Sequence, residues 1–306
     1  MSTGFILNEE FWMKVWYVIN QNALYVGKYW IKCIGGFATI LSITFLFVTW
    51  DDIGITSLNN KIEFLIVIII FLLFWSMLWI CFIKRKKVIW QSASGKIIVR
   101  YADLLEESFK SKKTECLYVI PVNSAFDTIV DEDISLCDKP LISPYSLHGR
   151  WLKKMLESGK KIKEIDEEIK ICLQKQKKVP CDFLKDKEKG KKEIYDLGTV
   201  AMVKGYSKNI FLLLALTDLD ENNIAHVSVE KMEEVIRDLI YFYDQHGQGH
   251  ELVIPLMGTN FSRAGLTHDD SLRIITSMFQ LYGDRIHGNV SIVIYKGDKD
   301  KVTIDI

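Results

Sequence analysis

The sequence has no net charge, because 39 lysine and arginine residues balance 39 aspartate and glutamate residues over 306 positions. A neutral chain has no overall field that would concentrate nucleic acid or other charged partners. We therefore expect no nucleic-acid partner. The balance hides an asymmetry, since apolar residues crowd the first 90 positions and charged residues crowd the remainder. The length allows about two structural units.

Cysteines are few, and none of them forms a CxxC pair. They are scattered along the chain, at Cys33, Cys81, Cys116, Cys137, Cys172 and Cys181. This spacing matches neither a metal-ligand set nor a disulfide framework, so we expect reduced thiols in a reducing compartment. Five histidines also lack the spacing of metal ligands or catalytic groups: His226, His246, His250, His268 and His287. We expect no bound metal.

Two long apolar stretches lie in the first 90 residues. Residues 29–50 carry one charge, Lys32, and residues 62–83 carry one, Glu63, each near the start of its stretch. A helix of about 20 apolar residues crosses the hydrocarbon core of a bilayer. We interpret the pair as two transmembrane helices. The alternative is a pair of buried core helices, but the second stretch is too apolar on every side for a soluble helix.

The cations predict the orientation of these two helices. Residues 84–87 (KRKK) directly follow the second stretch, and Lys28 and Lys32 lie at the start of the first. The loop at 51–61 contains two aspartates and one lysine. Because lysine and arginine mark the cytoplasmic side, we expect a multi-pass protein with both termini in the cytoplasm. Aromatic residues lie towards the ends of the stretches, as in membrane aromatic belts: Tyr29, Trp30, Trp50, Trp75, Trp79 and Trp90.

One face of the first stretch carries small residues, namely Gly35, Ala38, Thr39 and Ser42. Small residues let helices approach closely in lipid. This face predicts either association between chains or packing on the second helix of the same chain. No ionisable residue lies in the middle of either stretch, which argues against a transporter. Residues 1–27 predict an interfacial amphipathic helix or a cap on the soluble part.

After residue 90 the pattern alternates strands and helices. We expect strands within 95–105, 114–121, 250–256 and 290–295, and a hairpin that turns at 205–209. Capping residues predict helices after Ser228 and after Thr267, the latter with Asp270 in a capping box. The lysine-rich segment at about 155–195 predicts a helix followed by a solvated loop. The fold class is therefore α/β, with helices on both sides of a mixed sheet.

Polar loops follow two of the strands, and each of these strands ends in Ile-Pro. The loops read "VNSAFDT" after Pro121 and "MGTNFSRAG" after Leu256. Ligands of open α/β sheets bind beyond the carboxyl ends of the strands. The second loop leads to a helix N-terminus, where free N–H groups favour anions, and Gly258 allows close backbone approach. This loop suits a diphosphate; the alternative is a turn that only reverses the chain.

Three segments in this order resemble the signatures of a macro domain, the ADP-ribose-binding module: "IIVRYAD" at 97–103, "VIPVNSAF" at 119–126 and "IPLMGTNFSRAG" at 254–265. Together with the two preceding apolar stretches, they make the chain similar to the membrane effectors of type II Thoeris anti-phage defence. The resemblance is weakest at 1–27 and 155–195. It implies an N-terminal segment at 1–27, a transmembrane helical hairpin at 28–90 and a cytoplasmic macro-like three-layer α/β/α domain at 91–306.

The resemblance also implies roles for individual residues. Asp103 matches the adenine-binding aspartate, although it stands in "YAD" rather than "GD". Asn123 matches the first asparagine of the loop over the distal ribose, with Ser124 beside it, and Phe126 stands where many macro domains have a second asparagine. The diphosphate loop matches Gly258, Thr259, Asn260, Phe261, Ser262 and Arg263. His148 and Arg150 flank a glycine before a predicted helix; they predict either a pocket wall or a helix start with a surface histidine.

The glycine-rich catalytic loop of the family is absent, and "DTIVDEDISLCDKP" stands at 127–140 instead. We therefore predict no catalytic residue, no cofactor and no enzymatic activity. The resemblance implies an effector in the bacterial inner membrane that senses an ADP-ribose-type nucleotide, histidine-linked ADP-ribose made by a TIR-domain partner. Such an effector oligomerises and disrupts the lipid bilayer, which causes abortive cell death. The alternatives are a membrane-anchored ADP-ribosyl hydrolase and a reader of ADP-ribosylated proteins.

Overall fold

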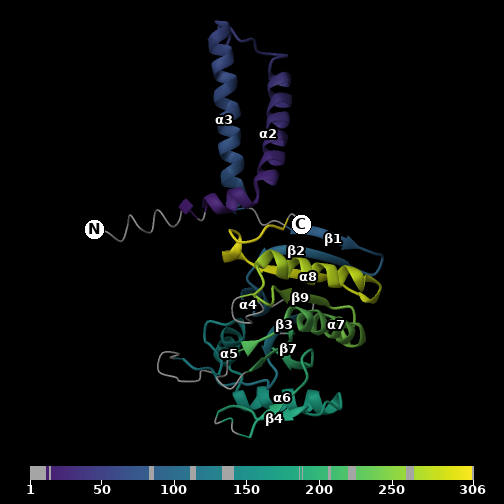
Figure 1. Cartoon of the computed structure of the whole chain (residues 1–306). Helices are drawn as coiled ribbons and strands as arrows, with labels where there is room; N and C mark the ends of the chain where they lie inside the picture. Colours follow the sequence, from purple (N-terminus) through teal and green to yellow (C-terminus); the bar gives the residue numbers. More distant parts are fainter. Residues whose placement is uncertain are drawn as a thin grey trace, which may run out of the picture. The chain divides into compact units, whose positions relative to one another are not determined.

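A computed structural model describes residues 12–13, 15–82, 86–110, 115–132, 141–185, 187, 189–205, 208–219, 225–259 and 265–304. The chain divides into two compact units. The first comprises Met1–Arg85 with Asp298–Ile306 and is helical, and the second comprises Lys86–Gly297 and is α/β (Figure 1). The C-terminal residues thus group with the N-terminal helices, which the sequence does not predict.

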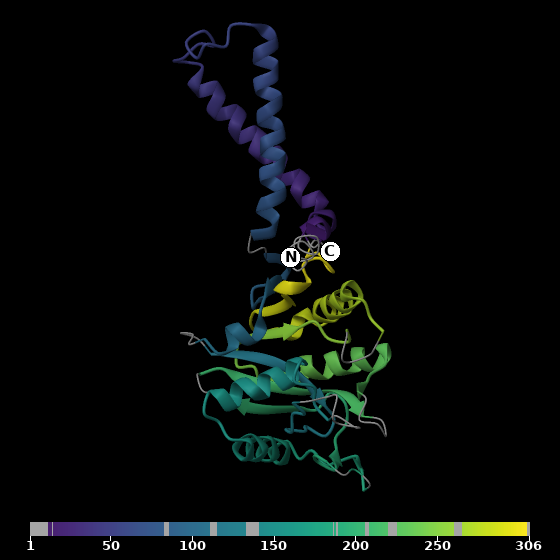
Figure 2. The same cartoon turned by 90° about the vertical axis from the view of Figure 1, so that its left-hand side faces the viewer.

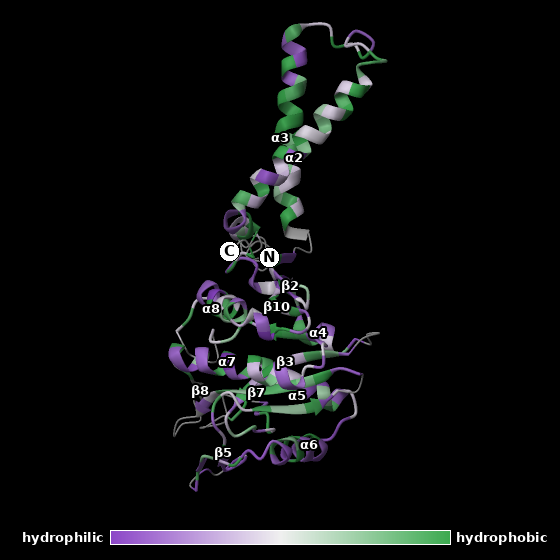
Figure 3. Cartoon of the chain, turned by 90° about the vertical axis from the view of Figure 1, so that its right-hand side faces the viewer, coloured by the Kyte–Doolittle hydropathy of each residue, from purple (hydrophilic) through white to green (hydrophobic). Residues whose placement is uncertain are grey.

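Two helices of the first unit pack against each other, α2 (Ala23–Thr44) and α3 (Leu58–Phe82), as Figure 2 shows. The α3 helix is apolar almost throughout (Figure 3), and its segment Leu58–Ile80 is long and apolar enough to cross a membrane. Among the described helices it is the only one that meets this test, whereas the sequence predicted two. The first stretch falls short because its helix contains two lysines and ends at Thr44, before the apolar residues up to Trp50.

The described residues before α2, 12–13 and 15–21, are also helical, and they expose Trp12, Trp16 and Tyr17. An N-terminal helix is thus present within 1–27, and its place at a membrane interface stays a prediction. The C-terminal tail packs inside the same unit. Thr303 Oγ1 hydrogen-bonds Asn22 Oδ1 at 3.0 Å, and Val302 and Ile304 are buried.

The second unit is built on one mixed sheet in the order β1-β2-β10-β9-β3-β7-β6, with β8 beside β7. Neighbours from β2 through β10, β9 and β3 to β7 are parallel, and β1 and β6 add antiparallel edges. The mixed α/β sheet confirms the predicted fold class. The strands are β1 (Lys86–Gln91), β2 (Lys96–Ala102), β3 (Cys116–Asn123), β6 (Val200–Lys204), β7 (Ile210–Leu219), β8 (Ala225–His226), β9 (Glu251–Pro255) and β10 (Val290–Tyr295).

Helices cover both faces of this sheet. They are α4 (Leu104–Ser108), α5 (Leu147–Glu157), α6 (Ile162–Lys175), α7 (Val229–His246) and α8 (His268–Leu281). Side chains alternate between the faces of a strand, and Tyr118 and Ile120 of β3 share a core with Trp151 of α5. The buried residues of α7 and α8 are not in that core, so they pack on the opposite face. The predicted caps are present, since Ser228 accepts from Lys231 N and Thr267 accepts from Asp270 N.

Two predictions about sequence segments need correction. Trp90 is not a membrane-belt residue, because it lies in β1 and packs on Gly283, where an added Cβ would lie 2.6 Å from the Trp90 ring. In the lysine-rich segment, α6 is the predicted helix, but the loop after it forms an antiparallel pair of short strands, β4 (Asp182–Phe183) and β5 (Glu193–Ile194). Part of that loop is buried, as described below.

Candidate functional site

Several predicted site residues converge at one edge of the sheet, where the parallel strands end. The register aligns Ala102 of β2 with Tyr295 of β10, and Val293 of β10 with Pro255 of β9. Since β3 runs parallel to β9, its last residue, Asn123, reaches the same edge. Asp103 follows β2 and Gly258 follows β9. We call this edge the C-terminal edge; it brings the three predicted motifs together, as expected for an α/β ligand site.

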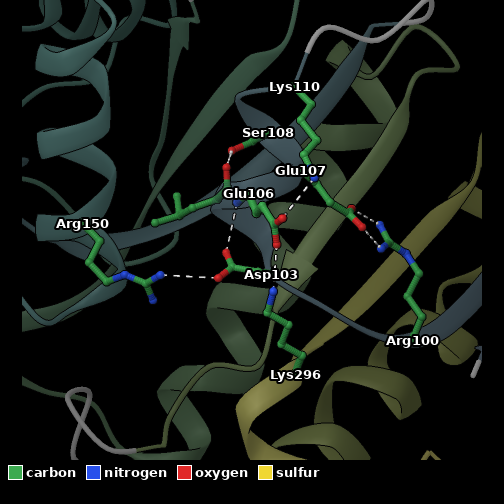
Figure 4. A network of polar contacts seen from close by, with 9 residues as sticks. Arg100, Asp103, Glu106, Glu107, Ser108, Lys110, Arg150 and Lys296 are labelled. Carbon is green, nitrogen blue, oxygen red and sulfur yellow. Dashed lines mark hydrogen bonds and ion pairs between the residues drawn. The ribbon is translucent and has the colours of Figure 1, made fainter. Parts of the chain in front are cut away.

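Asp103 lies at the start of α4, where it acts as the N-cap. Its side chain accepts a hydrogen bond from Glu106 N at 3.0 Å. The other carboxylate oxygen pairs with Arg150 Nη2 at 3.5 Å (Figure 4). The Asp103 side chain is 13% exposed and that of Arg150 is 40% exposed. The structure therefore places two predicted site residues from different segments side by side, partly accessible to solvent.

A network of ion pairs around Asp103 holds α4 in place (Figure 4). Arg100 on β2 donates two hydrogen bonds to Glu107, at 2.6 and 2.7 Å. Lys296, directly after β10, and Lys110 both hydrogen-bond Glu106, and these contacts lower the pKa of Glu106 to about 2. Glu106 thus stays charged at neutral pH, and α4 is tied to two neighbouring strands. The position of Asp103 depends on that arrangement.

Two residues of the loop after β3, Asn123 and Asp127, hydrogen-bond each other. Asn123 Nδ2 donates to Asp127 Oδ2 at 3.0 Å, and Asp127 N donates to Asn123 Oδ1 at 3.1 Å. Ser124 Oγ is buried and has no hydrogen-bond partner among the described residues. Phe126 is buried with φ 52°, and its ring meets the Tyr195 ring edge-on at 5.8 Å. We call residues 123–128 the ribose loop, after the role that the resemblance implies.

The lysine-rich segment contacts this loop directly, so the prediction of a solvated surface is wrong for part of it. Lys187 is only 8% exposed, and its Nζ lies 2.7 Å from Asp127 Oδ2. Lys191 N donates to Asp127 Oδ1, also at 2.7 Å. Sequence reasoning missed Asp127 and Lys187 because they lie 60 positions apart, and nothing in the local pattern distinguishes Lys187 from its neighbouring lysines.

His148 and Arg150 lie inside the first turns of α5, which begins at Leu147 after the N-cap Ser146. His148 is buried, so the interpretation as a surface histidine is wrong. Burial, together with the smaller effect of the nearby Lys191 charge, lowers the pKa of His148 to about 3. The imidazole is therefore neutral at pH 7, and its ring lies 6.2 Å from the Trp151 ring.

The depressed pKa of His148 predicts a loss of stability in mild acid. Unfolding restores a pKa of about 6.5, so the unfolded chain binds the extra proton between about pH 6.5 and 3. The stability contributed by neutral His148 is present above pH 6.5 and is lost as the pH falls through this window. We expect wild type to lose on the order of 2 kcal/mol more than His148→Gln between pH 7 and pH 5. Urea unfolding followed by tryptophan fluorescence measures these free energies of unfolding. His287→Gln, at an exposed histidine, is the control. Equal losses of stability in wild type and both variants would contradict the assignment.

The glycine loop after β9 is fixed against α7 and α8. Gly258 has φ +81°, and an added Cβ would lie 2.6 Å from Met232 Sδ and 2.9 Å from Leu266 Cδ1. Met257 N donates to Ser271 Oγ at 3.1 Å, and that hydroxyl donates to Met257 O at 2.5 Å. Thr259 is half-buried. The remaining predicted residues, Asn260, Phe261, Ser262 and Arg263, lie outside the described residues.

The N-terminus of α8 is partly satisfied by its own side chains. Thr267 and Asp270 form a capping box, and Thr267 Oγ1 also donates to Asp270 Oδ2 at 2.6 Å. Less of this helix terminus is therefore open to an anion than the sequence suggested. The close approach of an anion then depends on the backbone of the glycine loop. Across the described ranges, no group of three or more His, Cys, Asp or Glu side chains is placed to hold a metal ion.

A mixed sheet with helices on both faces, and with aspartate, asparagine and glycine loops at its C-terminal edge, defines a macro-type α/β domain. Residues 97–295 match the family described as Thoeris protein ThsA, Macro domain. The chain therefore belongs to this family.

Solved macrodomains share low sequence identity with the chain. The Oceanobacillus iheyensis macrodomain with ADP is 9% identical, with a TM-score of 0.38, and the match covers 71% of this chain and 94% of that one. A mutant of that macrodomain with ADPR is 10% identical, with a TM-score of 0.40 and coverage of 71% and 95%. The macrodomain of Mycobacterium tuberculosis DarG is 14% identical, with a TM-score of 0.36 and coverage of 64% and 96%. No curated protein matches the chain.

Proposed function

We propose that the α/β unit binds an ADP-ribose-type nucleotide at the C-terminal edge and does not catalyse a reaction on it. Membership of the Thoeris ThsA macro-domain family over residues 97–295 is the observation that carries this proposal. The geometry supports it, because Asn123 ends β3, and Asp103 and Gly258 follow β2 and β9, which are parallel strands that end at the same edge. In this proposal Asp103 accepts from the adenine amine, the glycine loop lies along the diphosphate, and Asn123 contacts the distal ribose.

The proposed role is that of a membrane effector in anti-phage defence. In this proposal the chain lies in the bacterial inner membrane with both termini in the cytoplasm, with α3 as one crossing and α2 as the other; the apolar segment Leu58–Ile80 supports the first crossing. The proposed signal is histidine-linked ADP-ribose from a TIR-domain synthase. A single pair of helices has no lumen, so permeabilisation requires several subunits. Ligand binding shifts the balance between monomer and oligomer only by the difference in affinity between the two states.

The small face of α2 supports association between chains. Gly35, Ala38, Thr39 and Ser42 are all exposed, and a Cβ on Gly35 would meet nothing within 4 Å. The face is therefore not packed on α3, which was the alternative that the sequence left open. Thr39 Oγ1 donates to Gly35 O at 2.9 Å and Ser42 Oγ to Ala38 O at 2.8 Å, so both hydroxyls are satisfied within the helix. Such a surface suits close helix contact in lipid.

The double substitution Gly35→Leu with Ser42→Leu is expected to abolish membrane permeabilisation and to leave ADP-ribose affinity unchanged. Bulky side chains on this face keep neighbouring helices apart, whereas the nucleotide site lies in the other unit. The measurements are dye leakage from liposomes and mass photometry in detergent, each with and without ADP-ribose.

The matched control is Gly36→Leu with Thr44→Leu, which adds the same bulk at exposed positions of α2 away from the small face. We expect the control to leak like wild type. Full leakage by the Gly35/Ser42 variant, or an oligomer size that does not depend on the nucleotide, would reject the proposed mechanism.

A further inference from the structure

A buried ion pair joins the lysine-rich segment to the ribose loop. Lys187 Nζ lies 2.7 Å from Asp127 Oδ2, and the two side chains are 4% and 0% exposed. Removing both charges from water is costly, and apolar side chains of similar volume often stabilise a fold as well or better. A buried pair at such a position is therefore explained better by a role in arranging the loop than by stability alone. Lys187 Nζ also donates to Lys191 O at 2.8 Å, which fixes the segment that carries it.

The carboxylate of Asp127 connects this pair to Asn123. Its Oδ2 accepts from both Lys187 Nζ and Asn123 Nδ2, and its Oδ1 accepts from Lys191 N. Because Asp127 N also donates to Asn123 Oδ1, the amide of Asn123 is held at both its nitrogen and its oxygen. A primary amide has two N–H donors and two acceptor lone pairs. Among the described residues, one donor and one lone pair of Asn123 are therefore left in a fixed orientation.

Two further contacts show that the segment is fitted to the loop. Gly190 has φ +84°, and a Cβ there would lie 2.3 Å from Asp127 Oδ1, so only glycine allows the approach. Lys191 Nζ donates to Phe126 O at 2.7 Å. Phe126 has φ 52°, a conformation that is unfavourable for a bulky residue and persists only where its surroundings hold it. Lys187 and Lys191 thus hold the carboxylate and the strained residue of the ribose loop, and Gly190 leaves room for the carboxylate.

We propose that Lys187 and Asp127 are positioning residues for the ligand, through which the lysine-rich segment orients Asn123 towards the distal ribose. This inference rests on the proposed function and extends it to a part of the chain outside the three macro-domain motifs. Lys187 does not contact the nucleotide in this scheme. It acts through Asp127, and its effect is confined to ligands that have a distal ribose.

Calorimetric titration of the full-length chain in detergent, with ADP-ribose and with ADP as separate probes, tests this inference. ADP has the adenosine and diphosphate but lacks the distal ribose. For Lys187→Met we expect the ADP-ribose affinity to fall about tenfold and the ADP affinity to stay unchanged. Lys192→Met is the matched control, because Lys192 is an exposed lysine of the same segment that donates to Lys185 O. We expect this control to bind both probes like wild type.

Gly190→Ala provides a second route that keeps every charge, since its Cβ would displace the Asp127 carboxylate. It is expected to show the same selective loss of ADP-ribose affinity, even if Lys187→Met does not fold.

An equal loss of affinity for both probes would mean that the pair only stabilises the fold. Unchanged affinities would mean that the pair does not act on the site. Either result overturns the inference. If wild type binds ADP but gains nothing from the distal ribose, the inference fails and nucleotide binding stands. If wild type binds neither probe, the proposed function fails as well.

Discussion

Replacing Gly258 with valine is expected to lower ADP-ribose affinity by more than about a hundredfold. The backbone at Gly258 has φ +81°, and an added Cβ would lie 2.6 Å from Met232 Sδ and 2.9 Å from Leu266 Cδ1. A branched side chain at this positive φ strains the loop and crowds Met232 and Leu266, so the diphosphate loses the close backbone approach that glycine permits. Calorimetric titration with ADP-ribose measures the effect.

Gly159→Val is the control that separates the effect on the site from backbone strain. Gly159 has φ +93°, so valine there carries a comparable strain of about 1–3 kcal/mol, but it lies after α5, outside the glycine loop, and its Cβ would meet nothing within 4 Å. Both variants should lose similar stability, and only the Gly258 variant should lose the ligand. Normal binding by a folded Gly258→Val protein would show that this loop does not cradle the diphosphate.

Asp103→Ala is expected to weaken ADP-ribose binding by about tenfold to a hundredfold, because the adenine amine loses a charged acceptor worth ~1.5–3 kcal/mol. The structure adds a second effect. Asp103 caps α4 through Glu106 N, so alanine also costs about 1 kcal/mol of stability. Arg150 loses its partner as well.

Asp103→Asn distinguishes the two effects, since asparagine caps helices about as well as aspartate but has no charge. We expect this variant to keep wild-type stability and to lose ligand affinity, measured by thermal unfolding and calorimetry on the same samples. Wild-type affinity in Asp103→Asn would remove the carboxylate from the adenine site and leave it the structural role of a helix cap.

Local pattern and capping chemistry were sufficient to predict much of the α/β unit. The apolar stripe of α7 and its cap at Ser228, and the capping box of Thr267 and Asp270 on α8, are present as predicted. β6 and β7 pair antiparallel up to Lys204 and Ile210, as the predicted hairpin requires. These features depend on residues close in sequence, so a single chain is enough to read them. The loops after β3 and β9 were predicted from the polar residues that follow these strands, because parallel strands bring their carboxyl ends to one edge. The role of Asp103 was implied only by the resemblance to a macro domain.

The features that sequence reasoning missed depend on contacts between distant residues. Lys187 is buried because Asp127 meets it from another segment, and the burial of His148 follows from the packing of α5. The end of α2 at Thr44 has a local cause that hydropathy alone does not register. The Phe45 and Trp50 rings pack 4.4 Å apart, and Thr49 N donates to Asp52 Oδ2 at 2.7 Å, so the chain turns where an uninterrupted apolar run predicted more helix.

Titration of the full-length wild-type chain with ADP-ribose, with AMP as the comparison, tests the central claim most directly. AMP has the adenine that Asp103 is proposed to bind but lacks the diphosphate and the distal ribose. The account predicts saturable binding of ADP-ribose at one site per chain, tighter than AMP and lost in Gly258→Val. The absence of saturable heat with ADP-ribose, or equal affinity for AMP and ADP-ribose, would contradict it.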